Sequence, residues 1–483
     1  MSVNEETLSR TIERFRERRI LLPTFAQMRD PTLVPEKVKQ RLKSVGLWDI
    51  DPVNLFRITW KNEPVERGGL YNHGNWIEFP PELTGIDARI IGLFGKFFPT
   101  GAHKVGAAYG CLVPKLVSGQ FDPTKHKAVW PSTGNYCRGG AFDSALVGCT
   151  AVAILPEEMS RERFEWLKEI GAEVISTPGC ESNVKEIYDK CWEIRRTRPD
   201  CVIFNQFEEF GNATWHYHVT GKTIQEIFSG LDGNPRLSGY VSATGSAGTI
   251  AAGDYLRTVH PHVRVVATEA LQCPTLYQLG FGGHRIEGIG DKHVPWIHNV
   301  RNTDMVAAID DEQCLSLFRL FNDPAGQTLL NHRVSDDVIQ QLPLLGISGI
   351  CNLVAAIKSA KYYDMNGRDV VFTCLTDSAG LYASRLEELA AEHGRYTPER
   401  AAYDQARYLD GIVTDHLREL TYHDRKALHN FKYFTWVEQQ GRTAEELREL
   451  WQPEFWDRTF AQAEEWDEQI KSFNERTGVL DLL

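Results

Sequence analysis

The sequence predicts an α/β protein with a doubly wound, mostly parallel β-sheet core. From about residue 90 to 385, short apolar runs rich in β-branched residues alternate with stretches whose apolar positions recur at spacings of three and four. The short runs are apolar at consecutive positions, which is typical of parallel strands covered by helices on both faces. The expected strands are 127–132, 150–156, 172–177, 201–207, 239–245, 263–270 and 369–375.

The segments between these strands predict helices and ligand loops. RERFEWLKEIG has helical periodicity and should end at Gly171, and NVKEIYDKCWEIRR, residues 183–196, repeats the pattern. Right-handed crossovers place ligand loops at the carboxyl ends of parallel strands. Two conspicuous loops, 132–140 and 245–248, follow the first and fifth expected strands.

The two ends of the chain differ from this core. Residues 1–80 combine a charged helix with loops rich in Pro, Gly and Trp. Beyond about residue 395 the chain reads as helical, with a capping box at Thr443 and Glu446 and four tryptophans between Trp436 and Trp466. Such aromatic residues pack more often onto the protein body or a sister subunit than onto a ligand.

Composition excludes several kinds of partner. A net charge of -12 argues against nucleic acid or an anionic membrane surface. No segment approaches the ~20 apolar residues of a membrane span, and the amino end is charged where a signal peptide is apolar, so we expect a cytoplasmic protein. The ten cysteines lie between Cys111 and Cys374 without a CxxC pair, which predicts reduced thiols and no metal site.

A single lysine stands in the unusual stretch FFPTGAHKVGAAYG, residues 97–110. Lys104 lies among small and apolar residues, where a partly desolvated amine loses its proton more easily, as a carbonyl-attacking lysine requires. The alternative is a lysine whose ammonium group reaches solvent.

A polar loop follows the first expected strand. In PSTGNYCRGG, the hydroxyls of Ser132 and Thr133 and the backbone amides near Gly134 converge at the amino end of a helix. Such a convergence of donors can bind a carboxylate.

A second loop, SATGSAGTIAAG at 242–253, also joins a strand to a helix. Its small residues let backbone amides approach an anion, and Ser246 and Thr249 add hydroxyl donors. The alternative is a tight turn without a ligand. The loop lacks the P-loop lysine and the GxGxxG of dinucleotide folds, which favours a phosphate without a nucleotide.

A third strand end, CLTDSAGLY, presents Thr376, Asp377 and Ser378 to the same cleft. An imine-forming lysine, a phosphate loop, a carboxylate loop and a polar partner for a ring nitrogen are together what pyridoxal phosphate needs to act on an amino acid.

These motifs resemble, in sequence order, those of the fold type II pyridoxal phosphate enzymes, specifically the cysteine synthase and cystathionine β-synthase family. The resemblance extends from about Phe98 to Tyr382. PTGAHK is similar to P-T-G-x-x-K, STGNYCRGGAF to the S-G-N-T-G segment, and LPEEMSRERFEWLKEIGAEVI to P-E-x-M-S-x-E-R…L-x-x-x-G-A. The family also has counterparts of the segments NQFEEFGNATWHYHVTGKTIQEI, GSAGT, GHRIEGIG, LLGISGI and LTDSAGLY.

The resemblance implies a tryptophan synthase β-like fold with two doubly wound parallel-sheet domains. The expected division is an N-terminal extension at 1–80, a catalytic core at 81–390 whose smaller domain covers roughly 115–220, and a helical C-terminal extension at 391–483. The resemblance also implies a homodimer, and the terminal aromatic residues are a second reason to expect one.

Roles for individual residues follow from the same resemblance. Lys104 would form the Schiff base and move the α-proton. The other implied cofactor contacts are Asn135, Gly245, Ser246, Ala247, Gly248, Thr249 and, at the pyridine nitrogen, Ser378. The implied substrate contacts are Ser132, Thr133, Gly134, Tyr136, Gln206 and Gly288.

The implied chemistry is β-elimination or β-replacement on a small L-amino acid through an aminoacrylate, with a thiol or another small nucleophile as second substrate. A serine at the ring nitrogen would favour it, because serine does not hold that nitrogen protonated as a carboxylate would. If Asp377 takes this position instead of Ser378, the preference could reverse. The alternatives are a dehydratase, deaminase or C–S lyase that releases ammonia and a keto acid, and a catalytically silent homologue that binds a partner.

The chain departs from the family pattern at several positions. Tyr136 replaces a small threonine and is expected to narrow the cleft. His103 either contacts the cofactor phosphate or is a core histidine. His284, His293 and His298 are expected at the cleft rim or in structural roles rather than as metal ligands.

Overall fold

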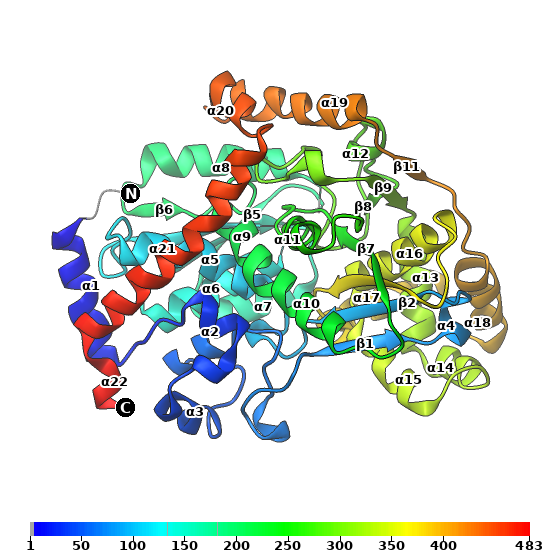
Figure 1. Cartoon of the computed structure of the whole chain (residues 1–483), viewed down its shortest axis with the longest axis horizontal. Coiled ribbons are helices and arrows are strands. Elements are labelled where there is room, and N and C mark those ends of the chain that lie inside the picture. Colours follow the sequence, from blue (N-terminus) through cyan, green and yellow to red (C-terminus); the bar gives the residue numbers. More distant parts are fainter. Residues whose placement is uncertain (1–3, 133, 181) are drawn as a thin grey trace.

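The computed structural model describes residues 4–132, 134–180 and 182–483 and contains two sheets (Figure 1). The larger sheet has the strand order β1-β2-β10-β7-β8-β9-β11. Strands β1 and β11 are antiparallel to their neighbours at the two edges, and the inner strands are parallel. Their bounds are β1 (Trp76–Phe79), β2 (Arg89–Phe94), β7 (Arg236–Ala243), β8 (Arg264–Ala270), β9 (Met305–Ile309), β10 (Asp369–Leu375) and β11 (Leu417–Glu419).

The smaller sheet has four parallel strands in the order β5-β4-β3-β6. Helices α6 (Asn135–Val147), α7 (Arg161–Glu169) and α8 (Val184–Thr197) connect these strands in sequence, which is how a parallel sheet is built. The strands are β3 (Lys127–Pro131), β4 (Ala151–Pro156), β5 (Glu173–Thr177) and β6 (Cys201–Ile203).

The remaining helices cover the sheets and form the two ends of the chain. They are α1 (Glu5–Arg18), α2 (Phe25–Arg29), α3 (Glu36–Leu42), α4 (Pro81–Thr84), α5 (Lys104–Val117), α9 (Phe210–Trp215), α10 (Lys222–Ser229), α11 (Ala251–Val259), α12 (Thr275–Gln278), α13 (Asp311–Asn322), α14 (Pro324–Leu330), α15 (Asp336–Gln341), α16 (Ile347–Tyr362), α17 (Ala383–His393), α18 (Pro398–Asp404), α19 (Tyr422–Lys432), α20 (Ala444–Glu449), α21 (Pro453–Thr477) and α22 (Val479–Leu482).

All seven expected strands form, and they are β3 to β8 and β10. The expected run 201–207 is too long, since β6 ends at Ile203. The Asn205 side chain accepts a hydrogen bond from the Phe207 amide at 3.2 Å and so starts a turn. Helix α7 ends at Glu169, close to Gly171, whose φ of +80° cannot continue the helix.

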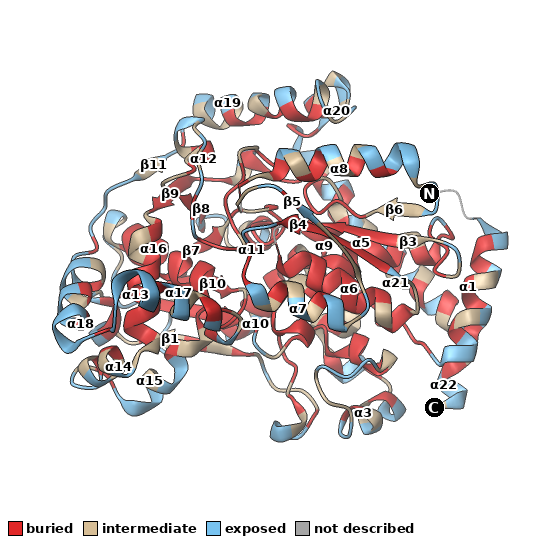
Figure 2. Ribbon diagram, turned by 180° about the vertical axis from the view of Figure 1, so that it is seen from behind, coloured by how far each residue is buried: buried red, intermediate tan, exposed pale blue. Residues whose placement is uncertain are grey.

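Helix α5 lies in the interior and carries Lys104 at its first residue. Both α5 and α6 are buried along most of their length (Figure 2). A Cβ at Gly139 of α6 would lie 2.7 Å from the Val105 Cα, so only glycine lets the two helices approach this closely. This close packing fixes the position of Lys104 relative to the loop before α6.

The two ends of the chain pack together and onto the core. Helices α1 and α21 lie side by side (Figure 1), and the Arg16 Nε donates to the Thr477 carbonyl at 2.8 Å. The expected capping box forms, because the Thr443 hydroxyl accepts from the Glu446 amide at 3.1 Å while the Glu446 carboxylate accepts from the Thr443 amide.

The four C-terminal tryptophans are buried within this chain. Trp436 and Trp456 pack in one apolar cluster with Trp296, and Trp466 contacts Phe25. These aromatic residues therefore give no support to a subunit contact.

Among the described residues, no single helix has the length and apolar character of a membrane span. Residues 336–344 and 347–362 meet such a test only as a pair bent by 117°, and most of α16 is buried inside the protein.

Candidate active site

Lys104 reaches residues from two other parts of the chain. Its Nζ donates to the Ser246 Oγ at 3.0 Å and to the Gln206 Oε1 at 3.3 Å. The turn that precedes α5 contains Thr100 with φ of +68°, a conformation that a non-glycine residue rarely adopts away from functional sites. The structure thus brings the expected lysine to residues of the expected phosphate and carboxylate sites.

The loop between β7 and α11 is held by an asparagine that sequence reasoning missed. Asn212 donates from Nδ2 to the Ser246 Oγ at 3.1 Å and to the Gln206 carbonyl at 3.0 Å. A Cβ at Gly248 would lie 1.9 Å from the Asn212 Oδ1, so the amide sits directly against the loop backbone. Ala247 has φ of +60°, which turns the loop tightly. The only signal for Asn212 was its place inside the family-like segment NQFEEFGNATW.

Two histidines support this loop from its buried side. The Thr249 Oγ1 lies 3.2 Å from the His103 Nε2 and 3.5 Å from the His216 Nε2. Both rings are fully buried, and burial, with the nearby Lys104 charge, lowers their pKa well below the usual range. Neutral imidazoles thus hold the Thr249 hydroxyl in place.

The loop before α6 is folded around an arginine. The Ser132 Oγ accepts a hydrogen bond from the Gly134 amide at 2.8 Å. Thr133 lies outside the described residues. Gly134 has φ of +148°, and a Cβ there would lie 2.0 Å from the Arg163 Nη1. The buried guanidinium of α7 therefore contacts the backbone of the expected carboxylate loop.

A buried carboxylate lies next to Asn135. The Asn135 Nδ2 donates to the Asp377 Oδ2 at 2.6 Å, and the Tyr382 hydroxyl donates to the same oxygen at 2.6 Å. Burial raises the Asp377 pKa, although these two hydrogen bonds and the Arg163 charge lower it. The neighbouring Ser378 begins the short turn Ala379–Leu381.

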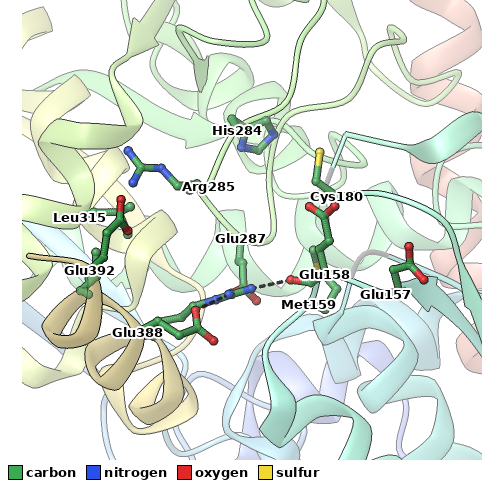
Figure 3. A pocket seen from close by; sticks show the side chains of 12 residues that line it. Glu157, Glu158, Met159, Cys180, His284, Arg285, Glu287, Leu315, Glu388 and Glu392 are labelled. Atoms are coloured by element: carbon green, nitrogen blue, oxygen red, sulfur yellow. Dashed lines mark hydrogen bonds and ion pairs between the residues drawn. The ribbon is translucent and has the colours of Figure 1, made fainter.

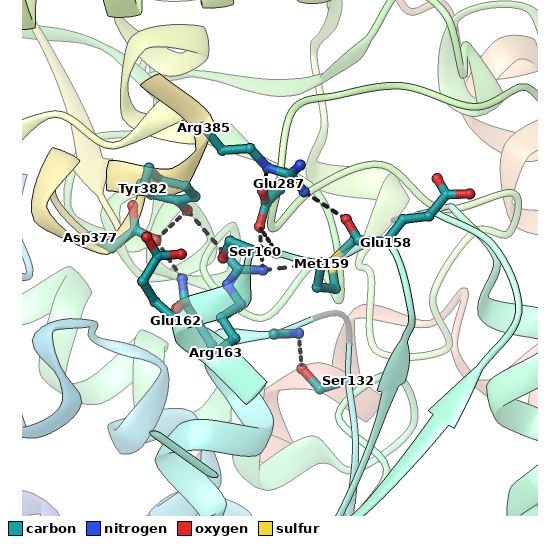
Figure 4. A network of polar contacts seen from close by, with 12 residues as sticks. Ser132, Glu158, Met159, Ser160, Glu162, Arg163, Glu287, Asp377, Tyr382 and Arg385 are labelled. Carbon is teal, nitrogen blue, oxygen red and sulfur yellow. Dashed lines mark hydrogen bonds and ion pairs between the residues drawn. The ribbon is translucent and has the colours of Figure 1, made fainter. Parts of the chain in front are cut away.

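Arg163 also belongs to a network that connects α7 with Glu287 and with the segment after β10 (Figure 4). Its Nη1 pairs with the Glu287 Oε2 at 3.0 Å, and its Nη2 donates to the Tyr382 hydroxyl at 3.0 Å. Glu287 also accepts from Arg385 at 2.5 Å, and Arg385 donates to the Glu158 carbonyl at 2.6 Å. Sequence reasoning did not single out either member of the Arg163–Glu287 pair.

Two other expected substrate residues, Gly288 and Tyr136, lie in different surroundings from each other. The Gly288 carbonyl lies 2.9 Å from where a Cβ of Gly245 would be, so Gly288 borders the phosphate-type loop. The Tyr136 hydroxyl donates to the Phe204 carbonyl at 3.1 Å, and its ring packs against Trp130. The Tyr136 side chain is therefore buried against Trp130 and Phe204 of the smaller-sheet region.

A cavity of about 470 Å³ is lined in part by Glu287 (Figure 3). Its walls come from the segment after β4, from the segment around His284, and from α17, and its lining includes Glu158, Arg285, Arg385 and Glu388. Lys104 is not part of its lining, so this cavity is an outer recess and not the site itself.

The three histidines considered as cleft or structural residues have protein partners. The Nε2 of His284 lies 3.1 Å from the Gly290 carbonyl, the Nε2 of His298 lies 2.9 Å from the Thr303 hydroxyl, and the His293 ring packs on Tyr188. Within the described ranges, no group of three or more His, Cys, Asp or Glu residues is arranged to hold a metal ion.

Comparison with known proteins places this site in a family. The profile described as "Pyridoxal-phosphate dependent enzyme" matches residues 96–328. Cysteine synthase of Staphylococcus aureus is 30% identical over 287 residues, which cover 59% of this chain and 84% of that protein. The chain belongs to the family of pyridoxal-phosphate dependent enzymes.

Other members of this family extend the comparison. Cystathionine beta-synthase of Saccharomyces cerevisiae is 27% identical over 315 residues, and the match spans 63% of this chain but only 59% of the yeast protein. The crystal structure of O-acetylserine dependent cystathionine beta-synthase from Helicobacter pylori matches with a TM-score of 0.54 at 24% identity, covering 64% of this chain and 94% of that one. This likeness confirms the fold type II architecture expected from the sequence.

The residues of this pyridoxal-phosphate dependent enzyme fit the cofactor. The Asn135 Oδ1, the Asn212 Oδ1 and the Asp377 Oδ1 are buried and lack a hydrogen-bond partner among the described residues. Unpaired polar atoms in a protein interior are costly, and a bound polar molecule or water would satisfy them. The lysine, the small-residue loop with its two hydroxyls, and these unpaired atoms supply what an aldehyde, a phosphate and a polar ring require.

Proposed function

We propose that the protein catalyses β-replacement on a small L-amino acid that carries a β-leaving group, with a thiol or another small nucleophile as the second substrate. The observation that carries the proposal is the joint hydrogen bonding of the Lys104 amine to Ser246 and Gln206. Relatives named cysteine synthase and an O-acetylserine dependent cystathionine beta-synthase support it.

Each group has a defined task in this proposal. Lys104 would hold the cofactor through its aldehyde, and its free amine would take the proton from the substrate Cα. The backbone amides of Gly245, Ala247 and Gly248 and the hydroxyls of Ser246 and Thr249 bind the phosphate. Pyridoxal phosphate, when bound, supplies the electron sink that makes the Cα–H bond acidic.

The substrate side is built by the loop before α6. Ser132, Thr133 and Gly134, with Gln206, bind the substrate carboxylate, and Asn135 donates to the ring hydroxyl of the cofactor. Gly288 leaves open space beside the site, since a Cβ there would meet nothing within 4 Å. The buried Arg163 guanidinium contacts the backbone of this loop at Gly134.

The carboxylate loop, Lys104 and Gln206 come from different elements, so the substrate is held where three segments meet. Binding of the α-carboxylate would orient the Cα–H bond toward Lys104, which is the arrangement that proton removal needs. Lys104 would deliver this proton to the departing β-group, and it would return the proton of the incoming nucleophile to Cα when that nucleophile bonds to Cβ. Hydrolysis in place of addition would give a keto acid and ammonia, which is the dehydratase or C–S lyase alternative.

The test compares two lysines of the same helix. The purified protein with added pyridoxal phosphate should show the visible absorbance of the lysine-bound cofactor, and Lys104→Ala should abolish it. Lys115→Ala, a control on α5 whose side chain pairs with Glu209, should retain the absorbance. Borohydride reduction followed by peptide mapping should label Lys104 alone.

Activity then separates the candidate reactions. With O-acetylserine and a thiol, the wild-type protein should form the thioether product, whereas keto acid release that is insensitive to the thiol would identify a lyase. A protein that binds no cofactor, or a Lys104→Ala variant that keeps the absorbance, would refute the proposal.

The remaining expectations stay predictions. They are the homodimer, the cytoplasmic location, the division at residues 80 and 390, and the substrate contact of Tyr136.

A further inference from the structure

A second recess, of about 420 Å³, lies between the end of α11, the turn Val300–Asn302 and the C-terminal part of the chain. That part includes α19, the orange helix at the top of Figure 1. The lining of the recess includes three arginines, Arg257, Arg301 and Arg425, and none of the described residues that line it is acidic. In a chain with a net charge of -12, this gathering of cations is a local feature.

Two of the arginines share one carboxylate that is not part of the lining. The Arg425 Nη2 donates to the Asp304 Oδ1 at 2.9 Å, and the Arg257 Nη2 donates to the Asp304 Oδ2. The Nε atoms of both arginines are buried and have no hydrogen-bond partner among the described residues. One carboxylate therefore neutralises only part of the charge of this pair.

Two more cations lie against the Trp451 ring, which also lines the recess. The Arg301 Nη1 donates to the Trp451 carbonyl at 2.9 Å, and its guanidinium carbon lies 5.7 Å from the ring centroid. The Lys426 Nζ lies 4.3 Å from the same centroid. Burial, together with the Arg301 charge, lowers the Lys426 pKa.

The contacts with Trp451 hold these two cations without neutralising them, because a ring carries no net charge. Neither Arg301 nor Lys426 forms an ion pair with a carboxylate of the described residues, whereas Arg257 and Arg425 both pair with Asp304. Four cations thus gather around one carboxylate. An anion bound in the recess would offset the repulsion among them.

A phosphate group fits this arrangement better than a carboxylate group. The three guanidinium groups come from three separate segments, and a tetrahedral phosphate accepts hydrogen bonds from more directions than a planar carboxylate does. The size of the recess is that of a small-molecule site. Tyr422, which is 63% exposed, also lines the recess and offers a ring to the organic part of a ligand.

We propose that this recess is a second binding site, separate from Lys104, and that it takes a small molecule carrying a phosphate or diphosphate group. Arg301 and Lys426 bind the phosphate oxygens from the side of Trp451. Arg257 and Arg425, held by Asp304, supply positive charge from the opposite segments.

Isothermal titration calorimetry with pyrophosphate tests this inference. The protein is first saturated with pyridoxal phosphate, which occupies the loop around Ser246, and is then titrated at neutral pH and constant ionic strength. We expect one pyrophosphate site per chain. Arg301→Gln and Lys426→Gln should each weaken binding about tenfold, because each removes one charge-assisted contact.

The matched control is Arg448→Gln, which also removes a positive charge from the C-terminal part of the chain. The Arg448 side chain is 71% exposed and pairs with Glu445, so its loss should change the affinity by no more than about twofold. Citrate at the same ionic strength separates a phosphate site from a general anion site, and it should bind about tenfold more weakly than pyrophosphate. Far-ultraviolet circular dichroism checks that each variant is folded, and either of the two test variants serves if the other is not.

Four results would overturn the inference. They are the absence of saturable pyrophosphate binding, unchanged binding in both Arg301→Gln and Lys426→Gln, an equal loss in Arg448→Gln, and binding of citrate as tight as that of pyrophosphate. The outcome does not depend on the reaction at Lys104. If no cofactor binds there, the proposed function fails, while the comparison of the wild type with Arg301→Gln still decides this inference.

Discussion

The buried pair of Arg163 and Glu287 should make an asymmetric contribution to stability. Both side chains are almost fully buried, with 0% and 3% exposure, and they are 3.0 Å apart. Replacing Glu287 by Gln leaves the Arg163 charge buried without its carboxylate, and removal of one partner of a buried pair costs about 3–5 kcal/mol. Replacing Arg163 by Met leaves Glu287 paired with Arg385, so we expect a cost of about 1–3 kcal/mol.

A double-mutant cycle tests this asymmetry by urea unfolding. Tryptophan fluorescence and far-ultraviolet circular dichroism should report the same transition. The double variant Arg163→Met/Glu287→Gln should be more stable than the sum of the single effects predicts, with a coupling of about 1–3 kcal/mol.

The matched control is Glu388→Gln, because Glu388 pairs with the same Arg385 but its side chain is 57% exposed. It should cost no more than about 1 kcal/mol. The reasoning is refuted if Glu287→Gln is as mild as the control, if Arg163→Met is the more harmful single change, or if the two effects add.

Two further predictions concern α16 and α19. Gly346→Ala should displace Asp377, because the new Cβ would lie 1.9 Å from the Asp377 Oδ1. We expect urea unfolding to show a free energy of unfolding lower by about 1–3 kcal/mol, and a titration to show weaker cofactor binding. Gly349→Ala in the same helix is the control, since its Cβ would make an ordinary contact at 3.4 Å, and equal effects of the two changes would contradict the prediction. Burial lowers the Lys432 pKa from 10.5 to about 7. Between these two pH values the unfolded chain therefore binds more protons than the folded chain. The free energy of unfolding of the wild type should rise with pH across this window, relative to that of Lys432→Met. Urea unfolding of both proteins at the two ends of the window measures the difference, and parallel pH profiles would show that Lys432 does not titrate as expected.

The sequence predicted β3 to β8 and β10 but missed β1, β2, β9 and β11, although β2 and β9 are buried along most of their length. Strands β9 and β11 were missed for physical reasons. Strand β9 (MVAAI) contains two alanines, which have low strand propensity. Strand β11 has only three residues, LRE, and it pairs with β9, from which it is separated by a long stretch of sequence. A local pattern cannot report a pairing that depends on a distant strand.

The site was predictable where a family-like motif carried the residue itself. Lys104 and the loop around Ser246 are of this kind. The partners of Arg163 were not, because Glu287 and Tyr382 are 124 and 219 positions away in the sequence and only the fold brings them together. Arg163 could have been found from its place at the end of the family-like segment PEEMSRER.

The choice between Asp377 and Ser378 shows the limit of residue-by-residue transfer. Both residues follow the same strand, and sequence order does not say which side chain faces the cleft. Asp377 accepts a hydrogen bond from Asn135 at 2.6 Å, whereas Ser378 precedes the turn Ala379–Leu381, and which of the two meets the ring nitrogen stays a prediction.

Residues 1–80, expected to form an N-terminal extension, contribute packing around the segment that carries Lys104. The Trp60 ring lies 5.4 Å from the His103 ring and 5.0 Å from the Phe98 ring, on either side of the turn that leads into Lys104. The Tyr109 hydroxyl of α5 donates to the Pro23 carbonyl at 2.7 Å. Because these contacts are buried, removal of the extension would expose the back of α5 and of the histidine pair that holds Thr249. These residues thus help to bury His103, whose neutral ring contacts Thr249 of the phosphate-type loop.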